Sequence, residues 1–524
     1  MRKSNLLGGA LLLCVLTLFT GCKEVMGSLD NPVSSYFELT ETTTKIYRGQ
    51  TYQIKYTTIS DAKPVFKSAD EKIALVDPNT GVITGANKGK TKITVELPAT
   101  TNYNAASKEF EVEVDALLSL PATEKEIAKG ATYDLGVKCE SDGVVTYKSS
   151  KTDVVTVDNT GKVTAKGYGD ATITISVAAT PKFDRSETAE FTAKVRVLDE
   201  AELNTIINTA AAGDGVVKVM LADGFELKNG LNLEGKKVSL DFMNTIATFN
   251  GDQSIIISHE FTLKNAKFDL TKSSYQLIQL SQDETVRGAL KTSKDVYTSA
   301  NQSGYCLIDG ITLENVWVKN LKNDLISDRN TKWAPENVTI KNCIVQADYT
   351  GSSSSVLWFN ASSIHNLDVD GNIFYNIYSD KTKGTQRFIS CMNSSNAVKV
   401  WGTTAVGDGT PATAGSRIEW KFNNNTCINV GYNKFGNNVI SSKNNMFMEG
   451  NNNIFYNVKQ IYQFFTANAN KTTTGNKIWC PNIDLNTNDT SRTDSEGNPL
   501  AKNEDPGITA PTTALDLVNG VKLK

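Results

Sequence analysis

The stretch Val338-Thr-Ile-Lys-Asn-Cys-Ile-Val345 decides the fold of the second half of this chain. Apolar and polar residues alternate, stop at Asn342 and then alternate again, which is typical of two short strands joined by a turn. Asn and Gly tolerate the left-handed backbone that a sharp turn requires. A strand–turn–strand unit cannot bury its apolar face alone, so repeated units would have to stack into one continuous core.

The pattern recurs at intervals that suit a β-solenoid. The turn residues of its copies are Asn265, Asn315, Asn342, Gly371, Asn424 and Asn452. They are separated by 50, 27, 29, 53 and 28 residues. If each of the two long gaps contains a degenerate coil, the 187 residues from the first turn to the last hold seven coils of roughly 27 residues. We expect coils from about Val238 to about Ile461, followed by polar loop that includes residues 468–476.

One further position of the repeat predicts a ladder of side chains. Asn372, Asn425 and Asn453 each directly follow a turn residue. Stacked coils would place these amides in one column, where each could hydrogen-bond the next. The alternative is that Asn is simply frequent in turns.

Length and composition indicate several modules and argue against some partners. At 524 residues the chain is too long for one ordinary domain. It has 54 Lys and Arg against 57 Asp and Glu, so we expect no nucleic-acid partner. The eight Cys are scattered and the two His lie far apart. We therefore expect no disulfide framework, no metal site of the zinc type and no His-based catalytic triad.

Residues 1–22 are expected to be a targeting segment. Two basic residues precede the apolar run Leu6–Phe19, which is too short for a permanent membrane-spanning helix. The run ends at Thr20-Gly-Cys22, which resembles the lipobox of bacterial lipoproteins. The resemblance implies a lipid anchor on Cys22 and hence the membrane as a partner. The alternative is ordinary secretion, and residues 23–37 predict a flexible tether in either case.

Two copies of one module follow, at residues 38–115 and 116–198. Short strands rich in Val, Ile and Thr, separated by frequent turns, predict a β-sandwich for each. The runs Val76-Asp-Pro-Asn-Thr-Gly-Val-Ile-Thr-Gly85 and Val157-Asp-Asn-Thr-Gly-Lys-Val-Thr-Ala165 resemble the signature of bacterial Ig-like domains of group 2, the first with one insertion. The resemblance implies that these domains are spacers on a cell surface.

Residues 199–524 form the third region, whose start has the apolar stripe of an amphipathic helix. The helix and the Gly-Asp turn and strands after it resemble the N-terminal cap of right-handed parallel β-helices in the pectin-lyase superfamily. Asp505-Pro-Gly507 resembles the turn before a closing strand. The expected fold class is therefore all-β, with two Ig-like β-sandwiches followed by a right-handed parallel β-helix. The stripe consists of Leu203, Ile206, Ile207, Ala210 and Ala211.

This combination resembles a set of Bacteroidota surface lipoproteins that are associated with polysaccharide capture and breakdown. The resemblance implies a lipid-anchored location at the outer membrane, exposed at the cell surface. It also implies a polysaccharide ligand, such as a pectin-like plant glycan, and an outer-membrane transporter as a further partner. The leading expectation is a protein that binds polysaccharide through a groove of the β-helix as part of a glycan-uptake system.

An enzymatic function is one alternative. A lyase or hydrolase acting on uronic-acid-containing glycans would need carboxylates that bind Ca²⁺ and a basic residue that removes a proton. Asp368 and Asp370 alternate on one strand and therefore share a face, and Arg387 follows them, so these three are the catalytic candidates. No cofactor is expected otherwise. Solvated surface charge is the simpler explanation for these residues and for a second, looser cluster of Asp324, Asp328 and Arg329.

Binding without catalysis needs exposed aromatic side chains that offer flat apolar faces to sugar C–H groups. Trp333 and Trp401 lie in loop-like surroundings and are the carbohydrate-binding candidates. The alternative is that they pack over the ends of coils. A third possible function is a structural adhesin, in which the Ig-like domains carry the interaction.

Overall fold

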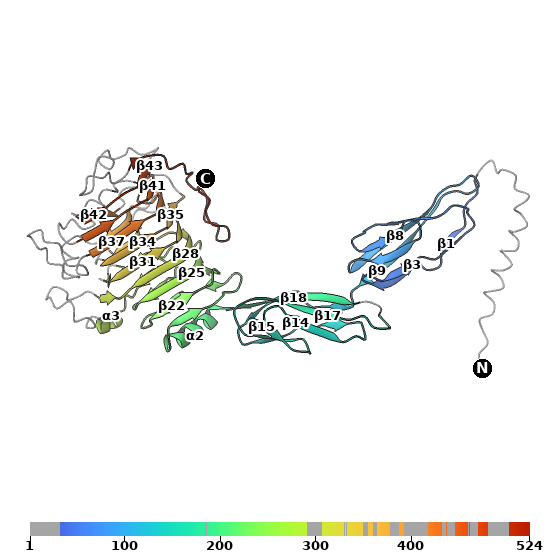
Figure 1. Cartoon of the computed structure of the whole chain (residues 1–524), viewed down its shortest axis with the longest axis horizontal. Coiled ribbons are helices and arrows are strands. Elements are labelled where there is room, and N and C mark those ends of the chain that lie inside the picture. The colour runs from blue at the N-terminus through green and yellow to red at the C-terminus, as the bar shows by residue number, and fades with distance from the viewer. Residues whose placement is uncertain are drawn as a thin grey trace, which may run out of the picture.

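The chain folds into two β-sandwiches and a stack of β-coils, arranged in that order in an elongated molecule (Figure 1). Cys22 and Trp401 lie outside the described residues. Within the described part, no helix has the length and apolar character needed to span a bilayer. The computed structural model of the chain describes residues 32–183, 186–290, 306–329, 331, 333–348, 355–359, 364–377, 387–391, 418–431, 436–437, 446–458, 461, 470–479 and 502–523.

The first sandwich packs a larger sheet against a smaller one. Along its strand β9, Phe110, Val112 and Val114 are buried and alternate with more exposed Glu residues, as the period of two requires. The larger sheet has the order β2 (Thr43–Tyr47), β9 (Ala106–Asp115), β8 (Gly89–Leu97) and β5 (Val65–Ser68). The smaller sheet is β3 (Thr51–Gln53), β7 (Val82–Gly85) and β6 (Ala74–Val76), and β1 (Phe37–Leu39) pairs with β4 (Tyr56–Thr58).

The second sandwich repeats this topology strand for strand. Phe191, Ala193 and Val195 of β18 take the places of the buried residues of β9. The larger sheet has the order β11 (Glu124–Ala128), β18 (Glu187–Arg196), β17 (Gly169–Val177) and β14 (Val145–Ser149). The smaller sheet is β12 (Thr132–Asp134), β16 (Lys162–Ala165) and β15 (Val155–Val157), and β10 (Leu118–Ser119) pairs with β13 (Lys138–Cys139).

The repeated Asp–Gly signature of the two modules is a tight turn. Asp77 Oδ1 accepts the N–H groups of Asn79 (2.9 Å) and Thr80 (2.8 Å), and Gly81 follows with φ +72°. In the second copy the equivalent Gly161 has φ +85°. This left-handed conformation costs glycine little, so the signature records a backbone requirement of the fold.

A capped helix, α2 (Glu200–Ala211), opens the third region, as its apolar stripe predicts. Its N-cap Asp199 accepts the N–H of Glu202 at 2.9 Å, and Glu202 in turn accepts the N–H of Leu198 at 2.8 Å. This arrangement is a variant of the capping box, because the N–H that Glu202 accepts belongs to Leu198 and not to the N-cap residue. Leu203 and Ile207 are buried and join the solenoid interior.

Each coil of the solenoid contributes to two parallel sheets. We call them the long sheet and the short sheet, and the fold is the parallel β-helix expected from the sequence. The long sheet has the order β19 (Val216–Lys218), β20 (Glu226–Leu227), β22 (Val238–Asp241), β23 (Ile246–Phe249), β25 (Phe261–Asp269), β28 (Ile311–Leu321), β31 (Asn337–Lys341), β32 (Ile344–Ala347), β34 (Asn366–Asp370), β35 (Ile373–Asn376), β37 (Ile418–Asn423), β38 (Thr426–Ile428), β40 (Met446–Glu449), β41 (Ile454–Tyr456), β42 (Asn470–Thr472), β43 (Lys477–Trp479) and β44 (Lys502–Asn503). The short sheet has the order β21 (Leu231–Leu233), β24 (Ile255–Ile257), β26 (Ile278–Leu280), β29 (Ile326–Ser327), β33 (Ser355–Phe359), β36 (Arg387–Cys391) and β39 (Gly436–Asn437).

The predicted turn residues are the corners of the long sheet. Their φ angles run from +46° at Asn265 to +68° at Gly371, the left-handed region that Asn and Gly tolerate. Asn244 (φ +64°) and Gly475 (φ +69°) add corners that the sequence pattern did not reveal. Gly475 precedes β43, so the solenoid continues through residues that we expected to be polar loop.

The expectation of a degenerate coil in each long gap is wrong. β25 pairs directly with β28, from Phe261↔Ile311 to Asp269↔Lys319. β34 likewise pairs directly with β37, from Asn366↔Glu419 to Asp370↔Asn423. The extra residues are therefore insertions, at 281–310 and 392–417, and both follow strands of the short sheet. The described part of the first insertion includes α3 (Glu284–Leu290) and β27 (Cys306–Ile308), and β27 pairs with β30 (Trp333–Pro335).

The predicted Asn ladder is present in the core, and Asn476 extends it. Asn425 Oδ1 accepts both the N–H (3.0 Å) and the Nδ2–H (2.9 Å) of Asn372, and Asn453 Oδ1 accepts the same groups of Asn425 at 2.9 and 3.2 Å. Cys343 holds the same slot one coil earlier, where its N–H donates to Asn372 Oδ1 at 2.8 Å. The ladder gives hydrogen-bond partners to buried N–H and side-chain amide groups at the corners, which would destabilise the fold if they stayed unpaired.

The C-terminal residues 504–523, which we call the strap, do not form the expected closing strand. Apart from an isolated bridge between Asp516 and Gly520, none of these residues is in a strand. Leu515 and Leu517 are buried against outward-facing apolar residues of the long sheet, including Tyr375 and Ile428. The strap thus covers an apolar stripe on the outside of the solenoid.

Candidate functional site

Asp368 and Asp370 lie on the outer surface of β34, as their alternation predicted, with Val369 buried between them. The register places Asp370 in a column with residues of alternating charge on four earlier strands. Asp368 lies 2.7 Å from Lys341, whose pKa this hydrogen bond raises, and Asp370 Oδ1 accepts from Asn424 at 2.7 Å. The column is Asp241, Lys264, Glu314, Lys341 and Asp370.

The structure does not bring Asp368 and Asp370 together with Arg387. Arg387 begins β36 of the short sheet, whereas both Asp residues belong to the long sheet. The carboxylates already neutralise Lys341 and bind Asn424, so they do not fit a Ca²⁺ site that faces a basic residue. Among the described residues, no group of three or more His, Cys, Asp or Glu side chains could hold a metal ion. The structure therefore does not support a catalytic site formed by Asp368, Asp370 and Arg387 together.

Trp333 cannot serve as a sugar platform in this structure, because it is fully buried. Its surroundings are a strand, since β30 pairs in parallel with β27 of the insertion. The indole Nε1–H donates to the carbonyl of Ser281 at 2.6 Å. Trp333 is therefore a packing residue between the insertion and the solenoid, whereas the alternative weighed for it was packing over the end of a coil.

The outer side of the short sheet carries a tryptophan that the sequence pattern did not single out. Trp358 of β33 is half-buried and lies in register between Ser327 of β29 and Ser390 of β36. Its strand reads Ser-Val-Leu-Trp-Phe, so no polar residue marks the outward positions. Only the register, set by buried Leu357 against Ile326 and Ile389, reveals where Trp358 lies.

Polar side chains line up at the N-terminal edge of the short sheet, beside Trp358. Arg387 pairs in register with Ser355, and its Nη1 donates to Ser390 Oγ at 3.3 Å. It is half-buried, and this burial lowers the pKa of its guanidinium. In the described part of the chain Arg387 forms no ion pair with a carboxylate. A half-buried cation without an anionic partner is a natural contact for an anionic ligand.

Asp324 lies one strand before Ser355 at this edge. Its Oδ1 accepts the N–H of Ser355 at 3.0 Å, and burial raises the pKa of the Asp324 carboxyl to about 7. The hydroxyl of Ser327 and the charge of Arg329 offset part of that effect. Of the looser cluster expected from the sequence, Arg329 acts on Asp324, whereas Asp328 is fully buried near the other end of β33, where its N–H donates to Trp358 O at 3.0 Å.

The two insertions follow strands of the short sheet in the chain. Connections between the two strands of one corner are short, as at residues 342–343 and 371–372. The connections that leave the short sheet include residues 281–310 and 392–417. Loops on a rigid scaffold commonly carry binding residues, so the short sheet is the side of the solenoid suited to a ligand.

Comparison with known families identifies the two β-sandwiches. Residues 35–106 and 118–183 match the family model described as "Bacterial Ig-like domain (group 2)". The chain carries two bacterial Ig-like domains. No curated protein matches the chain.

Several solved structures resemble about a third of the chain at low identity. Domains 4 and 5 of the S-layer protein SbsC are 16% identical, over 32% of this chain and 99% of that one, with a TM-score of 0.14. Drosophila N-cadherin EC1-4 is 13% identical, over 32% of this chain and 50% of that one, with a TM-score of 0.15. Fibronectin(III)-like modules of Clostridium thermocellum CbhA are 15% identical, over 30% of this chain and 94% of that one, with a TM-score of 0.13.

The second bacterial Ig-like domain is joined to the solenoid directly after its strand β18. β18 runs into Val197, whose N–H donates to Met220 O at 2.7 Å and whose carbonyl accepts the N–H of Ala222 at 2.9 Å. Val197 is fully buried in the solenoid core. Because Val197, the residue directly after β18, is also part of the solenoid's first coil, the chain passes from one unit into the other without a linker.

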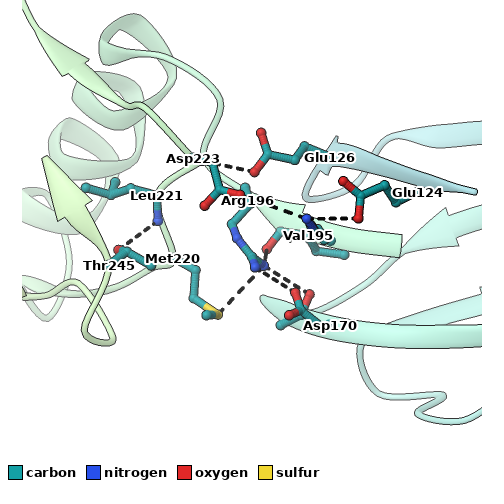
Figure 2. A network of polar contacts seen from close by, with 11 residues as sticks. Glu124, Glu126, Asp170, Val195, Arg196, Met220, Leu221, Asp223 and Thr245 are labelled. Carbon is teal, nitrogen blue, oxygen red and sulfur yellow. Dashed lines mark hydrogen bonds and ion pairs between the residues drawn. The ribbon is translucent and has the colours of Figure 1, made fainter. Parts of the chain in front are cut away.

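Polar contacts brace this joint (Figure 2). Arg196 is 6% exposed and forms an ion pair with Asp170 at 2.6 Å, and its Nη1 lies 4.0 Å from the sulfur of Met220. Glu126 accepts the N–H of Asp223 at 3.0 Å, and Lys194 lies 3.9 Å from the Asp223 carboxylate. Contacts from several strands therefore converge on the first turn of the solenoid.

Proposed function

We propose that this chain is a surface lipoprotein, anchored through Cys22, that binds an acidic polysaccharide along the outer side of the short sheet. The two bacterial Ig-like domains would act as spacers, and the solenoid would hold the polymer. A uronic-acid-containing glycan fits the proposal, because it combines sugar rings with carboxylates. Binding without cleavage is favoured over lyase or hydrolase activity, since Asp368 and Asp370 lie on a different sheet from Arg387.

One observation carries the proposal: Trp358 and Arg387 lie on neighbouring strands of one sheet. Ser390, which accepts a hydrogen bond from Arg387, is the register partner of Trp358. Neighbouring strands are about 4.8 Å apart, which is within the width of a sugar ring. An aromatic face for the ring beside a guanidinium for its carboxylate is a suitable arrangement for recognising an acidic sugar unit.

The test is the affinity of the chain from Ser28 onward for polygalacturonate, with a neutral galactan as comparison. We expect the Arg387→Gln variant to bind polygalacturonate roughly tenfold or more weakly, the cost of losing a charge-assisted hydrogen bond. Arg387→Lys should recover part of the affinity, because it keeps the charge but not the planar fork.

Lys341→Gln is the matched control, because Lys341 is a cation of the long sheet and already pairs with Asp368. It should leave the affinity unchanged. Equal affinities of the Arg387→Gln and Lys341→Gln variants, or no affinity of the unaltered chain for any acidic polysaccharide, would contradict the proposal.

A further inference from the structure

A cavity of about 440 Å³ lies between the strap and the outer side of the long sheet. Tyr375 of β35 forms its solenoid wall, and the strap forms the rest. The volume is within the range of pockets that hold small ligands. It lies on the long sheet, whereas Trp358 and Arg387 are on the short sheet. The strap residues that line it are Thr509–Ala514, Asp516 and Gly520–Lys522.

The wall residue Tyr375 has an unusual environment. Its side chain is fully buried, and within the described part of the chain its hydroxyl has no hydrogen-bond partner. Burial also raises the pKa of this phenol, so the hydroxyl stays protonated and can donate. A buried hydroxyl without a partner costs the apo protein free energy that a phenylalanine would not cost. Tyr375 lines the cavity, but its hydroxyl is not exposed to it in this structure. A ligand that supplies the missing acceptor would therefore reach the hydroxyl only when the strap moves.

The part of the strap over the cavity is held by apolar packing of Ile508 and Ala510 and not by hydrogen bonds among the described residues. Residues 508–514 form no hydrogen bond with any other described residue. The strap is instead fixed further on, where Lys267 Nζ donates to Leu517 O at 2.7 Å and Leu515 N–H donates to Gln346 at 3.4 Å. Segment 508–514 can therefore lift without breaking hydrogen bonds among the described residues, which gives a ligand access to Tyr375.

We infer that this cavity binds one uncharged sugar ring, with the Tyr375 hydroxyl donating a hydrogen bond to a ring substituent. Thr509, Thr512 and Thr513 offer hydroxyls that both donate and accept, and the Pro511 ring offers an apolar surface for C–H groups. Asp516 and Lys522 carry opposite charges, so the lining does not favour an ion. The choice of a sugar rests on the proposed function, whereas the cavity and the unpaired hydroxyl do not.

The test uses thermal unfolding of the chain from Ser28 onward, alone and with D-galactose or D-xylose at millimolar concentrations. Without sugar, Tyr375→Phe should raise Tm by about 2 °C, because it removes an unpaired buried hydroxyl. With sugar, Tm of the unaltered chain should rise, and this rise should be lost in Tyr375→Phe. Tyr456→Phe is the control, because Tyr456 also packs against the strap cluster but does not line the cavity; its sugar response should match the unaltered chain.

Two results would overturn the inference. One is a lower Tm of Tyr375→Phe without sugar, which would mean that the hydroxyl has a structural partner. The other is that the sugar does not raise Tm of the unaltered chain, or raises Tm of the unaltered chain and of Tyr375→Phe by the same amount. If the same proteins still bind polygalacturonate, the proposed function stands while this inference fails. If the sugar raises Tm as expected but the chain has no affinity for any acidic polysaccharide, the inference stands while the proposed function fails.

Discussion

At the scale of single residues, the ladder of core asparagines explains why this chain repeats Asn at two successive corner positions. The first Asn of each pair supplies the left-handed backbone, and the second satisfies corner groups of its neighbour. Asn425 illustrates the second role, since its Nδ2 also donates to Val369 O at 2.9 Å. A single substitution within the ladder should therefore cost more than one at the corner.

We predict that Asn425→Ala lowers the free energy of unfolding by roughly 2–4 kcal/mol, because it leaves the N–H and side-chain amide of Asn372 and the carbonyl of Val369 unpaired inside the core. Asn424→Gly is the control, because its φ of +56° suits glycine and its side chain is exposed. It should cost less than about 1 kcal/mol. Urea unfolding of both variants measures the difference, and equal costs would mean that the ladder is not a source of stability.

Asp324 should make stability fall as pH rises. Burial raises its folded pKa from 3.8 to about 7, so between these values the folded chain holds a proton that the unfolded chain has released. The stabilisation is fully present below pH 3.8 and is lost as pH rises through about 7.

The Asp324→Asn variant removes this titration and keeps an oxygen for the N–H of Ser355. We expect it to be more stable than the unaltered chain at pH 8 by about 1–3 kcal/mol, and the difference to shrink towards pH 5. Thermal unfolding of both proteins from pH 5 to pH 8 checks this. A difference that does not change with pH would show that Asp324 titrates normally.

At the scale of elements, the strap depends on one lysine. Lys267 Nζ donates to Leu517 O and lies 4.3 Å from the centre of the Trp317 ring, and burial lowers the pKa of Lys267. Gly520 passes close to the same ring, at a φ of +77°. The ammonium group therefore ties the strap to the long sheet.

Replacing this lysine by methionine keeps the apolar stem but removes the tie. We predict faster amide hydrogen exchange across residues 508–523 in Lys267→Met, by roughly five- to tenfold, the equivalent of one lost hydrogen bond. Lys264→Met is the matched control, because Lys264 pairs with Glu314 at 2.7 Å. Exchange in the strap that is equally fast in both variants would argue against the role of Lys267.

The sequence predicts local elements well where a periodic pattern marks them. Each of these features is marked by a short local pattern: the corners by a turn residue, the ladder of Asn372, Asn425 and Asn453 by the position directly after it, and the capping helix by its apolar stripe. The insertions were mistaken for degenerate coils, because spacing alone cannot distinguish a weak repeat from a loop. Only strand pairing across the gaps resolves the two.

Long-range contacts account for what the sequence did not reveal about the candidate site. Trp333 lies in a loop-like stretch, yet it pairs with Cys306 of an insertion and is buried. Trp358 lies in an apolar run, yet register places it on the outside of the short sheet. The strap packs more than a hundred residues away in sequence from Tyr375, and no local pattern predicts such a contact.

At the scale of the whole molecule, the two Ig-like domains differ in charge at the end that faces the next unit. At four equivalent positions of the two strand registers, the side-chain charge of the first domain is opposite to that of the second. The equivalent pairs are Lys45 and Glu126, Lys90 and Asp170, Glu113 and Lys194, and Asp115 and Arg196. In the first domain Asp115 pairs with Lys45 and Lys88 of the same domain. In the second domain Glu126 and Lys194 also contact the solenoid.

We predict that Arg196→Met loosens the joint between the second Ig-like domain and the solenoid, because Asp170, Gly169 and Met220 lose their shared partner. The distance distribution between spin labels on the two units should broaden, and the second domain should lose about 1–3 kcal/mol of stability. Asp115→Asn is the control at the equivalent position and should leave that distribution unchanged. An unchanged distribution in Arg196→Met would mean that the backbone hydrogen bonds of Val197 are enough to fix the joint.

The most direct test is to locate the surface of the chain that binds a polysaccharide. Hydrogen exchange of the chain from Ser28 onward, with and without polygalacturonate, measures this. Slower exchange is expected in Ile326–Ser327, Ser355–Phe359 and Arg387–Cys391, the strands that carry Ser327, Trp358 and Arg387. Protection confined to residues 38–198, or found on the long sheet and absent from these strands, would contradict the account.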